Sequence, residues 1–268
     1  MLGNIIGDLA GSVYEFKQSL KCEPVYTCTI IPQRAFFSDD TILTIAVIDA
    51  ILSHSSYETK LKEYALEYED KVPDYKPYFQ KMFSPNFLRW VKSNSVGESH
   101  GNGAMMRVAP VGFLFDSEEE VLVNARLATQ PSHNSESALQ CAQTIALIIF
   151  YARKGLQKDE IIKKLNLTVT KPVVDKFNYT CEDTIGICLY AFFTSNSFNE
   201  AIKTTLSFGG DTDTNACIVG GMAEAMWGID GSLKRQALQI LPEPLKKVLK
   251  DGYAFLENKQ SLNQVPDK

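Results

Sequence analysis

The sequence predicts an all-α protein, folded as a compact orthogonal or irregular bundle of many helices. Segment after segment places apolar residues at positions i, i+3, i+4 and i+7, which is the period of a helix with one buried face. The alternation typical of strands is limited to two short stretches, residues 25–31 and 167–170. The chain has 268 residues, of which 45% are hydrophobic and 22% charged, so it can bury a sizeable core. Periodicity and composition therefore agree on the fold class.

The chemistry of the segment ends supports the individual helices. Gly155 follows Arg153 and Lys154, which is typical of a helix C-terminus. Residues 197–200, Ser-Phe-Asn-Glu, have the form of a capping box at a helix start. In chain order, we predict helices at residues 2–15, 41–53, 57–68, 117–128, 135–153, 158–165, 182–193, 198–206, 212–227 and 233–241.

The first predicted helix carries a stripe of glycines. Gly3, Gly7 and Gly11 recur at intervals of four, so they share one face, and each destabilises a helix by about 1 kcal/mol relative to alanine. Such a stripe favours close approach by another helix or by a ligand. Asp8 and Glu15 are two turns apart, and their carboxylates are expected near the face that carries Gly11.

The chain is expected to form one domain, residues 1–257, followed by a polar C-terminal tail, residues 258–268, because it has no internal repeat or long linker. The net charge is −5 at pH 7 and the lysines are widely spread, which gives no basic patch for nucleic acid or an anionic membrane. A small substrate or a protein is the expected partner.

Cysteine usage and the N-terminus predict a soluble, cytoplasmic protein, which we expect to be a monomer. The N-terminus lacks the basic region of a secretory signal, and the longest apolar stretch, residues 144–152, is too short to span a membrane. The cysteines form no Cys-x-x-Cys pair, so reduced core thiols are expected for all six: Cys22, Cys28, Cys141, Cys181, Cys188 and Cys217.

Two acidic clusters each precede a strongly apolar helix. The first is Ser38-Asp39-Asp40-Thr41, followed by the apolar run 42–47. The second, Asp211-Thr212-Asp213-Thr214, follows two glycines and leads into the run 216–223. Because both runs are too apolar for a surface helix, each cluster is expected at the mouth of a buried helix.

Two interpretations of these clusters stay open. Serine, threonine and aspartate cap helix N-termini, and for either cluster alone this is the commoner role. Capping needs only one such residue per helix, however, and four aspartates that met in a low-dielectric site would repel one another unless cations neutralised them. Oxygen ligands without paired cysteines or clustered histidines favour Mg²⁺ or Mn²⁺ over Zn²⁺, and four aspartates are enough for two ions.

Four motifs follow one another along the chain: Gly7-Asp8-x-x-Gly11-x-x-x-Glu15, the Ser-Asp-Asp-Thr cluster, Gly101-Asn102-Gly103-Ala104-Met105-Met106-Arg107, and Gly209-Gly210-Asp211-Thr212-Asp213-Thr214. In this order they resemble the ADP-ribosylglycohydrolase family, over residues 3–228. The family includes dinitrogenase-reductase-activating glycohydrolase and the hydrolases of ADP-ribosylarginine and ADP-ribosylserine. The resemblance implies a helical fold of that type with two Mg²⁺ or Mn²⁺ ions in a cleft, and cleavage of the glycosidic bond at the distal ribose.

The resemblance also implies the residues of the metal centre. Glu15 matches a family glutamate beside the metals that is thought to act on the attacking water, so Glu15, Asp39 and Asp40 are the predicted catalytic residues. Glu15 could instead be an exposed residue at a solvated helix end. For Asp8 the alternative to a place in the site is a structural role. The predicted metal ligands are Ser38, which stands where the family usually has threonine, and Asp39, Asp40, Asp211, Asp213 and Thr214.

Substrate binding is predicted at two further places. Residues 99–104 resemble the family loop that holds the diphosphate and ribose, where small residues let backbone N–H groups approach phosphate oxygens. His133 matches a family histidine near the ligand, although Ser135 replaces a second histidine and a structural role is equally open. Arg107 either neutralises phosphate or pairs with a buried aspartate. The predicted substrate-binding residues are Gly101, Asn102, Gly103, Ala104, Met105 and His133.

The predicted function is metal-dependent removal of ADP-ribose from a modified protein side chain, with arginine favoured, or from a small ADP-ribosyl conjugate. The ions would anchor the distal ribose and position a water, while Glu15, Asp39 or Asp40 accepts its proton. Two alternatives remain. A metal-dependent phosphohydrolase would release AMP or phosphate, and a non-catalytic, crystallin-like protein would bind ADP-ribose without turnover.

Overall fold

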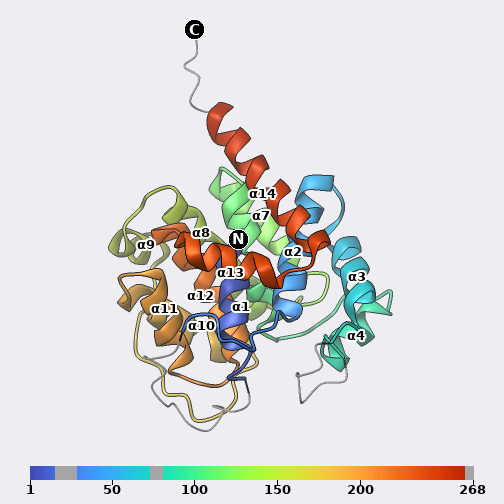
Figure 1. Ribbon diagram of the computed structural model, residues 1–268, viewed down its shortest axis with the longest axis horizontal. Coiled ribbons are helices and arrows are strands. Elements are labelled where there is room, and N and C mark those ends of the chain that lie inside the picture. Colours follow the sequence, from blue (N-terminus) through green and yellow to red (C-terminus); the bar gives the residue numbers. More distant parts are fainter. Residues whose placement is uncertain (16–28, 73–80, 263–268) are drawn as a thin grey trace.

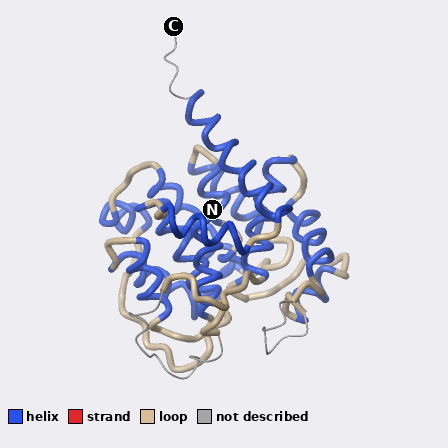
Figure 2. Tube along the Cα trace, in the orientation of Figure 1, coloured by secondary structure: helices blue, strands red, loops and turns tan. Residues whose placement is uncertain are grey.

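The computed structural model of the protein describes residues 1–15, 29–72 and 81–262, and its regular elements are helices (Figures 1 and 2). Within these residues the chain forms no β-strand, and its β-type pairing is limited to two isolated bridges, Glu98 with His133 and Gly101 with Thr180. The all-α prediction is confirmed.

The two strand predictions do not hold where the structure tests them. Residues 167–170 are not a strand: Leu167 and Val169 pack against the core while their neighbours are exposed, so the alternating pattern reflects one-sided packing without strand pairing. Residues 29–31 are not a strand either, and the remainder of the stretch 25–31 lies outside the described residues.

Every predicted helix has a counterpart. The bounds are α1 Leu2–Gly11, α2 Asp39–Ser53, α3 Tyr57–Tyr68, α4 Pro85–Val91, α5 Gly103–Met106, α6 Ala109–Leu114, α7 Glu118–Thr129, α8 Glu136–Arg153, α9 Lys158–Leu165, α10 Cys181–Thr194, α11 Phe198–Leu206, α12 Thr212–Trp227, α13 Gly231–Ile240 and α14 Glu243–Leu262.

Four helices were not predicted: α4, α5, α6 and α14. The helices α5 and α6 have 4 and 6 residues, too few to display a helical period. Helix α4 does carry readable signals, since Ser84 accepts a hydrogen bond from the Phe87 amide and Pro85 occupies the first turn. Helix α14 continues to Leu262, beyond the domain boundary predicted at residue 257.

Helix α1 lies against α12, and the glycine stripe explains how closely they pack. A Cβ atom on Gly3, Gly7 or Gly11 would lie 2.2, 1.9 or 2.2 Å from a backbone oxygen of α12, far inside van der Waals contact. The contacts run in opposite directions along the two helices, from Gly3 beside Gly220 to Gly11 beside Thr212. The predicted close approach of another helix is therefore confirmed, and it brings the C-terminal end of α1 to the N-terminal end of α12.

The first helix is shorter than predicted, because its regular turns stop at Gly11 rather than at Glu15. There the backbone tightens: the Tyr14 amide donates to the carbonyl of Gly11 at 2.9 Å, a spacing of three residues. The Ser12 hydroxyl donates to the Leu9 carbonyl at 2.9 Å and accepts from the Phe36 amide at 3.2 Å. A short turn therefore carries Glu15.

The opposite end of α1 is tied to α12 and α14. The α-amino group of Met1 forms a buried ion pair with Glu224, and the Gly3 amide donates to the same carboxylate at 2.7 Å. The Leu2 amide donates to the hydroxyl of Tyr253 at 2.8 Å, and this hydroxyl in turn donates to Glu224. These bonds fix the first turn of α1, so its other end is held in place at the acidic clusters.

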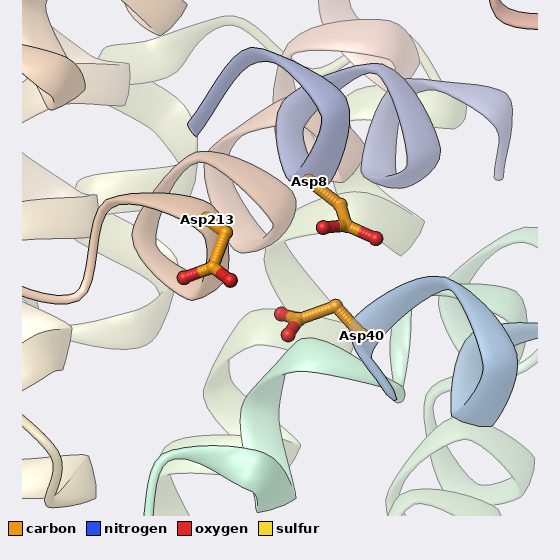
Figure 3. Close-up of side chains that lie close together, drawn as sticks. All are labelled: Asp8, Asp40 and Asp213. Carbon is orange, nitrogen blue, oxygen red and sulfur yellow. The ribbon is translucent and has the colours of Figure 1, made fainter. Parts of the chain in front are cut away.

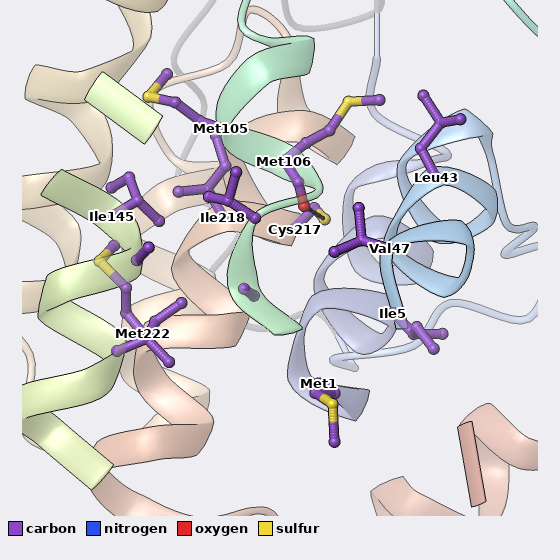
Figure 4. Close-up of a cluster of buried hydrophobic side chains, with 14 of the residues drawn as sticks. Met1, Ile5, Leu43, Val47, Met105, Met106, Ile145, Cys217, Ile218 and Met222 are labelled. Atoms are coloured by element: carbon purple, nitrogen blue, oxygen red, sulfur yellow. Dashed lines mark hydrogen bonds between the residues drawn. The ribbon is translucent and has the colours of Figure 1, made fainter. Parts of the chain in front are cut away.

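The core fills the space between the pair α1 and α12 and the helices α2, α5 and α8 (Figure 4). It includes the cysteines that the structure describes, Cys141, Cys181, Cys188 and Cys217, which are free and buried as expected. Cys22 and Cys28 lie outside the described residues. In the part of the chain that is described, no helix is both long and apolar enough to cross a membrane.

Candidate metal centre and ligand cleft

The two acidic clusters meet in space. Asp8 from α1, Asp40 from α2 and Asp213 from α12 direct their carboxylates toward one another (Figure 3), and each offers an oxygen within 4.8 Å of the others. All three side chains are buried. Residues from three distant parts of the sequence therefore form one acidic centre.

A second group of carboxylates shares Asp213. Glu15, Asp211 and Asp213 also offer oxygens within 4.8 Å of one another, and Glu15 is the most exposed of the three. The turn after Gly11 thus carries Glu15 to the centre, although the helix predicted there ends earlier. Asp39 borders the cavity into which this acidic centre opens.

Burial and mutual repulsion make these carboxylates hard to ionise. Burial, followed by the charge of Asp213, raises the pKa of Asp8 to about 7. The same two causes hold the pKa of Asp40 and that of Asp211 well above the usual range, and the charge of Asp39 adds to both shifts. A divalent cation would remove this penalty, because it favours the ionised form of every carboxylate around it.

The donor atoms suit such a cation. The Oδ1 atoms of Asp8 and Asp40 are buried and have no hydrogen-bond partner among the described residues. An unpartnered buried carboxylate oxygen is costly unless a cation binds it. The ligand set is made of carboxylate and hydroxyl oxygens, which is typical of Mg²⁺ and Mn²⁺ sites.

Helix capping explains part of the clusters. The Ser38 hydroxyl accepts from the Asp40 amide at 3.2 Å and so caps α2, as the simpler interpretation predicted. It also donates to Oδ2 of Asp40 at 3.1 Å, and the Thr214 hydroxyl donates to that oxygen at 3.3 Å. Asp211 occupies the N-cap position of α12, but its side chain makes no capping bond. Capping therefore accounts for Ser38 and not for Asp211.

Asp8 has the structural role that the sequence suggested for it. Its Oδ2 atom accepts from the amides of Ser38 and Thr41, at 2.8 and 3.2 Å, and from the Thr41 hydroxyl. The carboxylate thereby holds the start of α2 in position beside α1. Its other oxygen, Oδ1, faces the acidic centre. Asp8 therefore holds the start of α2 and is also part of the acidic centre.

The acidic centre opens into a cavity of about 950 Å³. Glu15, Asp39, Asp40, Asp211, Asp213 and Thr214 lie in its wall, and Ser38 is fully buried behind Asp40. A second part of the wall is aromatic: the rings of Phe83, Phe87 and Trp90 follow one another with centroid distances of 5.6 and 5.2 Å. A cavity of this size is typical of small-molecule sites.

Three loops form another part of the wall, and backbone hydrogen bonds join them. The loop 97–103 is bonded to the loop 131–134 through Gly97, whose amide donates to the Pro131 carbonyl at 2.8 Å and whose carbonyl accepts from Asn134 at 2.9 Å. It is bonded to the third loop, residues 178–181, through the Asn102 amide, which donates to the Tyr179 carbonyl at 2.9 Å. The β-type pairing between these loops is limited to isolated bridges, so none of the three loops is a regular strand.

The predicted substrate-binding residues divide into two groups. Gly101, Asn102, Gly103 and His133 lie in the cavity wall. Ala104 and Met105 do not: both are fully buried, and Met105 packs in the core (Figure 4). The Met105 amide already donates to the Asn102 carbonyl at 2.8 Å, so it is not free to bind a phosphate.

Asn102 also supports Asp211, a contact that the sequence did not predict. Its amide group donates to Oδ2 of Asp211 at 2.7 Å and to the Thr184 hydroxyl at 3.3 Å. Asn178, which carried no sequence signal, accepts from the Asp211 amide at 3.0 Å and donates to Thr184 and Asn215 at 2.9 and 2.8 Å. These buried side chains hold Asp211 from behind.

The glycine before Asp211 is required by this network. Gly210 has a φ of 74°, a conformation that favours glycine, and a Cβ atom there would lie 2.1 Å from Oδ1 of Asn178. Gly209 also has a positive φ, 70°, so backbone geometry explains both glycines of the fourth motif, and the space that Asn178 occupies is a second reason at Gly210.

Arg107 does not pair with an aspartate. It is fully buried, and its hydrogen-bond partners among the described residues are backbone carbonyls and a hydroxyl, with no carboxylate among them. Its Nη2 atom donates to the Ala128 carbonyl at 3.0 Å and to the Ser132 hydroxyl at 2.6 Å, while Nε and Nη1 have no partner there. Burial lowers the pKa of Arg107 to about 9, so the guanidinium stays charged at neutral pH. The interpretation of Arg107 as the partner of an aspartate is therefore wrong.

A helical fold that gathers carboxylates in the wall of a cavity suits a metal-dependent hydrolase, and comparison with known proteins identifies the family. The sequence profile of the ADP-ribosylglycohydrolases matches residues 1–265, so the chain belongs to that family. It is an ADP-ribosyl glycosidase, as its sequence predicts.

Individual relatives are distant but match along most of their length. ADP-ribosylhydrolase ARH3 of Mus musculus is 23% identical, over 86% of this chain and 83% of its own. ADP-ribosylarginine hydrolase Tri1 of Pseudomonas putida is also 23% identical, over 86% of this chain and 70% of its own. A solved structure of an ADP-ribosylglycohydrolase-related protein complex has the same fold, with a TM-score of 0.72, 19% identity, and coverage of 96% of this chain and 95% of the other.

Proposed function

We propose that the protein removes ADP-ribose from modified proteins or small conjugates by hydrolysing the glycosidic bond at the distal ribose, with two divalent cations in its acidic centre. The observation that carries this proposal is the convergence of the two carboxylate groups, which share Asp213, in the wall of one cavity. The relatives named as hydrolases of ADP-ribosyl groups support the same substrate class.

The proposed ligands of the cations are Ser38, Asp39, Asp40, Asp211, Asp213 and Thr214. When bound, Mg²⁺ or Mn²⁺ supplies positive charge that orients ribose hydroxyls and makes a water more acidic. Asp8 is buried beside these ligands, and Ser38 and Thr214 donate to Asp40. The protein thus holds Asp40 in one orientation before any substrate arrives.

Glu15 is the proposed general base. Its carboxylate lies within 4.8 Å of Asp211 and Asp213, at the open side of the acidic centre. In the proposed reaction, Glu15 takes a proton from water, the water oxygen bonds to the anomeric carbon of the distal ribose, and the bond to the acceptor breaks as the acceptor gains a proton. Asp39 and Asp40 remain candidate bases in the same wall.

The rest of the ligand is proposed to lie along the three joined loops. Gly101 and Gly103 leave room for phosphate oxygens beside the backbone, and His133 faces the same space. The acceptor is proposed to be an arginine side chain, in line with the relative named as an ADP-ribosylarginine hydrolase. The aromatic wall formed by Phe83, Phe87 and Trp90 would then limit which acceptors fit.

The test is release of free ADP-ribose from ADP-ribosyl-arginine and ADP-ribosyl-serine peptides, with Mg²⁺ or Mn²⁺ and then with a chelator. We expect metal-dependent release from the arginine peptide. Release of AMP or phosphate would favour a phosphohydrolase instead. Binding of ADP-ribose without release from either peptide would favour a non-catalytic protein.

Variants of the acidic centre separate metal binding from catalysis. Asp211→Ala combined with Asp213→Ala should abolish both turnover and Mn²⁺ binding measured by calorimetry, because it removes a proposed ligand from each carboxylate group. Glu15→Gln should retain Mn²⁺ binding but lose turnover by about 100-fold or more, the usual effect of removing a general base. Full activity of the double variant would refute the proposal.

A further inference from the structure

A chain of hydrogen bonds connects a buried arginine to a histidine in the cavity wall. Nη2 of Arg107 lies 2.6 Å from the Ser132 hydroxyl, and this hydroxyl lies 2.7 Å from Nδ1 of His133. The three residues are between 0% and 5% exposed. The chain runs from Arg107, the residue that follows α5, into the loop 131–134, and all three residues border the cavity.

The donors and acceptors of this chain fix where the imidazole proton lies. A guanidinium can only donate, so the Ser132 oxygen accepts from Arg107. The hydroxyl proton must then point elsewhere, and the other partner of this oxygen among the described residues is Nδ1 of His133. If Nδ1 carried a proton, the buried hydroxyl proton would have no acceptor. Nδ1 therefore accepts, and the proton of the neutral ring is on Nε2.

The charges around His133 keep the ring neutral. Burial, the guanidinium of Arg107 and then the imidazole of His100 hold the pKa of His133 well below its usual range. Arg107 and His100 therefore both disfavour a second proton on the ring of His133. His133 is consequently a donor at one nitrogen and an acceptor at the other throughout the neutral pH range.

The protonated nitrogen faces the loop that contains the Gly-x-Gly motif. Cβ atoms on Gly101 and Gly103 would lie 3.5 and 3.4 Å from Nε2 of His133, so this nitrogen lies against both glycines. Nε2 has no hydrogen-bond partner among the described residues, and His133 is part of the cavity wall. An acceptor oxygen in the cavity could take its proton in a hydrogen bond.

We propose that Arg107 and Ser132 are positioning residues that fix His133 as an Nε2–H donor, directed at an oxygen acceptor of the bound ligand. The acceptor is a phosphate oxygen or a ribose hydroxyl of a sugar nucleotide. Only this identity of the ligand rests on the proposed function. The tautomer itself follows from the hydrogen bonds of the ligand-free protein.

The direct test is ¹⁵N NMR of the histidine side chains in the ligand-free protein. The chain has three histidines, so the His54→Asn and His100→Asn variants assign the signals by elimination. We expect Nδ1 of His133 to have the shift of an unprotonated nitrogen and Nε2 that of a protonated one. A protonated Nδ1 would overturn the proposal, whatever the protein hydrolyses.

The variant Ser132→Ala tests whether the hydroxyl sets the tautomer. Without it, Nδ1 loses its donor, so we expect a mixture of tautomers and about tenfold weaker binding of ADP-ribose in Mg²⁺, the usual effect of losing one hydrogen bond. Ser195→Ala is the matched control. It removes an equally buried hydroxyl, 1% exposed, that donates to the Ala191 carbonyl away from the cavity, and it should leave the His133 signals unchanged. An unchanged tautomer in Ser132→Ala would refute the role of Ser132.

Ligand titrations identify the acceptor and separate this proposal from the enzymatic one. A shift of the Nε2 signal with pyrophosphate points to a phosphate oxygen, and a shift with ADP-ribose alone points to a ribose hydroxyl. Saturation with ADP-ribose without any change at Nε2 would exclude the donor role. Failure to release ADP-ribose from peptides would refute the proposed function but leave the tautomer measurement valid.

Discussion

Asp8, Asp40 and Asp211 are buried carboxylic acids that keep their protons to unusually high pH. Unfolded, they would ionise near about pH 4, whereas the pKa of Asp8 is raised to about 7 in the folded chain and those of Asp40 and Asp211 are raised as well. Between these pKa values the folded state binds more protons than the unfolded state. The free energy of unfolding of the metal-free protein should therefore fall as the pH rises through this range.

This pH dependence can be separated from that of other groups with Asp40→Asn. The amide cannot ionise and lowers the repulsion around Asp8, so the variant should lose less stability than the wild type between about pH 5 and pH 8. Chemical denaturation in a chelator at each pH measures the difference. In saturating Mg²⁺ the wild type should no longer lose stability over this pH range, because the cation favours the ionised carboxylates. Equal slopes for the two metal-free proteins would contradict the raised pKa of these groups.

Asn102 is the residue whose predicted role the structure most changes. Its bond of 2.7 Å to Asp211 makes it a support for a proposed metal ligand as well as part of the cavity wall. Asn102→Ala should weaken Mn²⁺ binding in the ligand-free protein by about tenfold or more, the usual effect of losing such a support. Calorimetry measures the Mn²⁺ affinity directly.

A matched control for this variant exists on α7. Asn124, like Asn102, makes two side-chain hydrogen bonds: its Oδ1 accepts from the Tyr57 hydroxyl and its Nδ2 donates to the Glu120 carbonyl. It is not part of the cavity wall. Asn124→Ala should leave Mn²⁺ affinity unchanged. If Asn102→Ala also leaves it unchanged and weakens only ADP-ribose binding, Asn102 is a ligand contact and not a support.

The sequence predicts the acidic residues better than their supports, and the reason is physical. Asp39 and Asp40 are adjacent in the chain, and Asp211 and Asp213 are two residues apart. The repulsion within each pair is therefore apparent before the structure is known. Asn178 has no such neighbour, since the atoms it bonds belong to residues 6 to 37 positions away. Only the folded loops bring these groups together.

The pairing of α1 with α12 is the element on which the acidic centre depends. Because a Cβ atom on Gly7 would lie 1.9 Å from the Ala216 carbonyl, Gly7→Ala must separate the two helices. Overpacking of this kind costs about 1–3 kcal/mol and sometimes more. Since Asp8 and Asp213 belong to these helices, the variant should lose Mn²⁺ affinity together with stability, as measured by calorimetry and denaturant unfolding.

Gly186 provides the opposite case in a helix of similar length. It lies in α10, and a Cβ atom there would meet no atom within 4 Å. Gly186→Ala should therefore stabilise the protein by about 0.5–1 kcal/mol, because alanine favours the helix. Similar effects of the two substitutions would mean that helix propensity, and not the contact with α12, determines the result at Gly7.

At this scale the sequence predicts the helix contact but not the end of the helix. The interval of four between Gly3, Gly7 and Gly11 is visible in the chain, and so is the need for a close neighbour. The end of α1 at Gly11 depends on Ser12, whose hydroxyl binds Phe36 from another part of the chain. Helices α5 and α6 are stabilised by burial in the core, and no local sequence pattern predicts that burial.

The complete site exists only in the folded molecule, because its parts come from the whole length of the chain. The turn at Glu15, the starts of α2 and α12, and the loops 97–103, 131–134 and 178–181 all border one cavity. The loops are joined through backbone hydrogen bonds, so a ligand that touches one of them restrains the others. Ligand binding should accordingly have effects far apart in sequence but close in space.

Hydrogen exchange can measure this convergence. With Mg²⁺ and ADP-ribose, we expect slower amide exchange in all three loops and in the first turn of α2, and no change in α9, which contributes nothing to the cavity wall. At a ligand concentration of about 100 times Kd, the free energy of unfolding should rise by about 2.7 kcal/mol. Asp213→Ala should abolish both effects, because Asp213 belongs to both carboxylate groups. Protection confined to a single loop would mean that the three loops do not respond as one unit, and that the ligand occupies only part of the cavity.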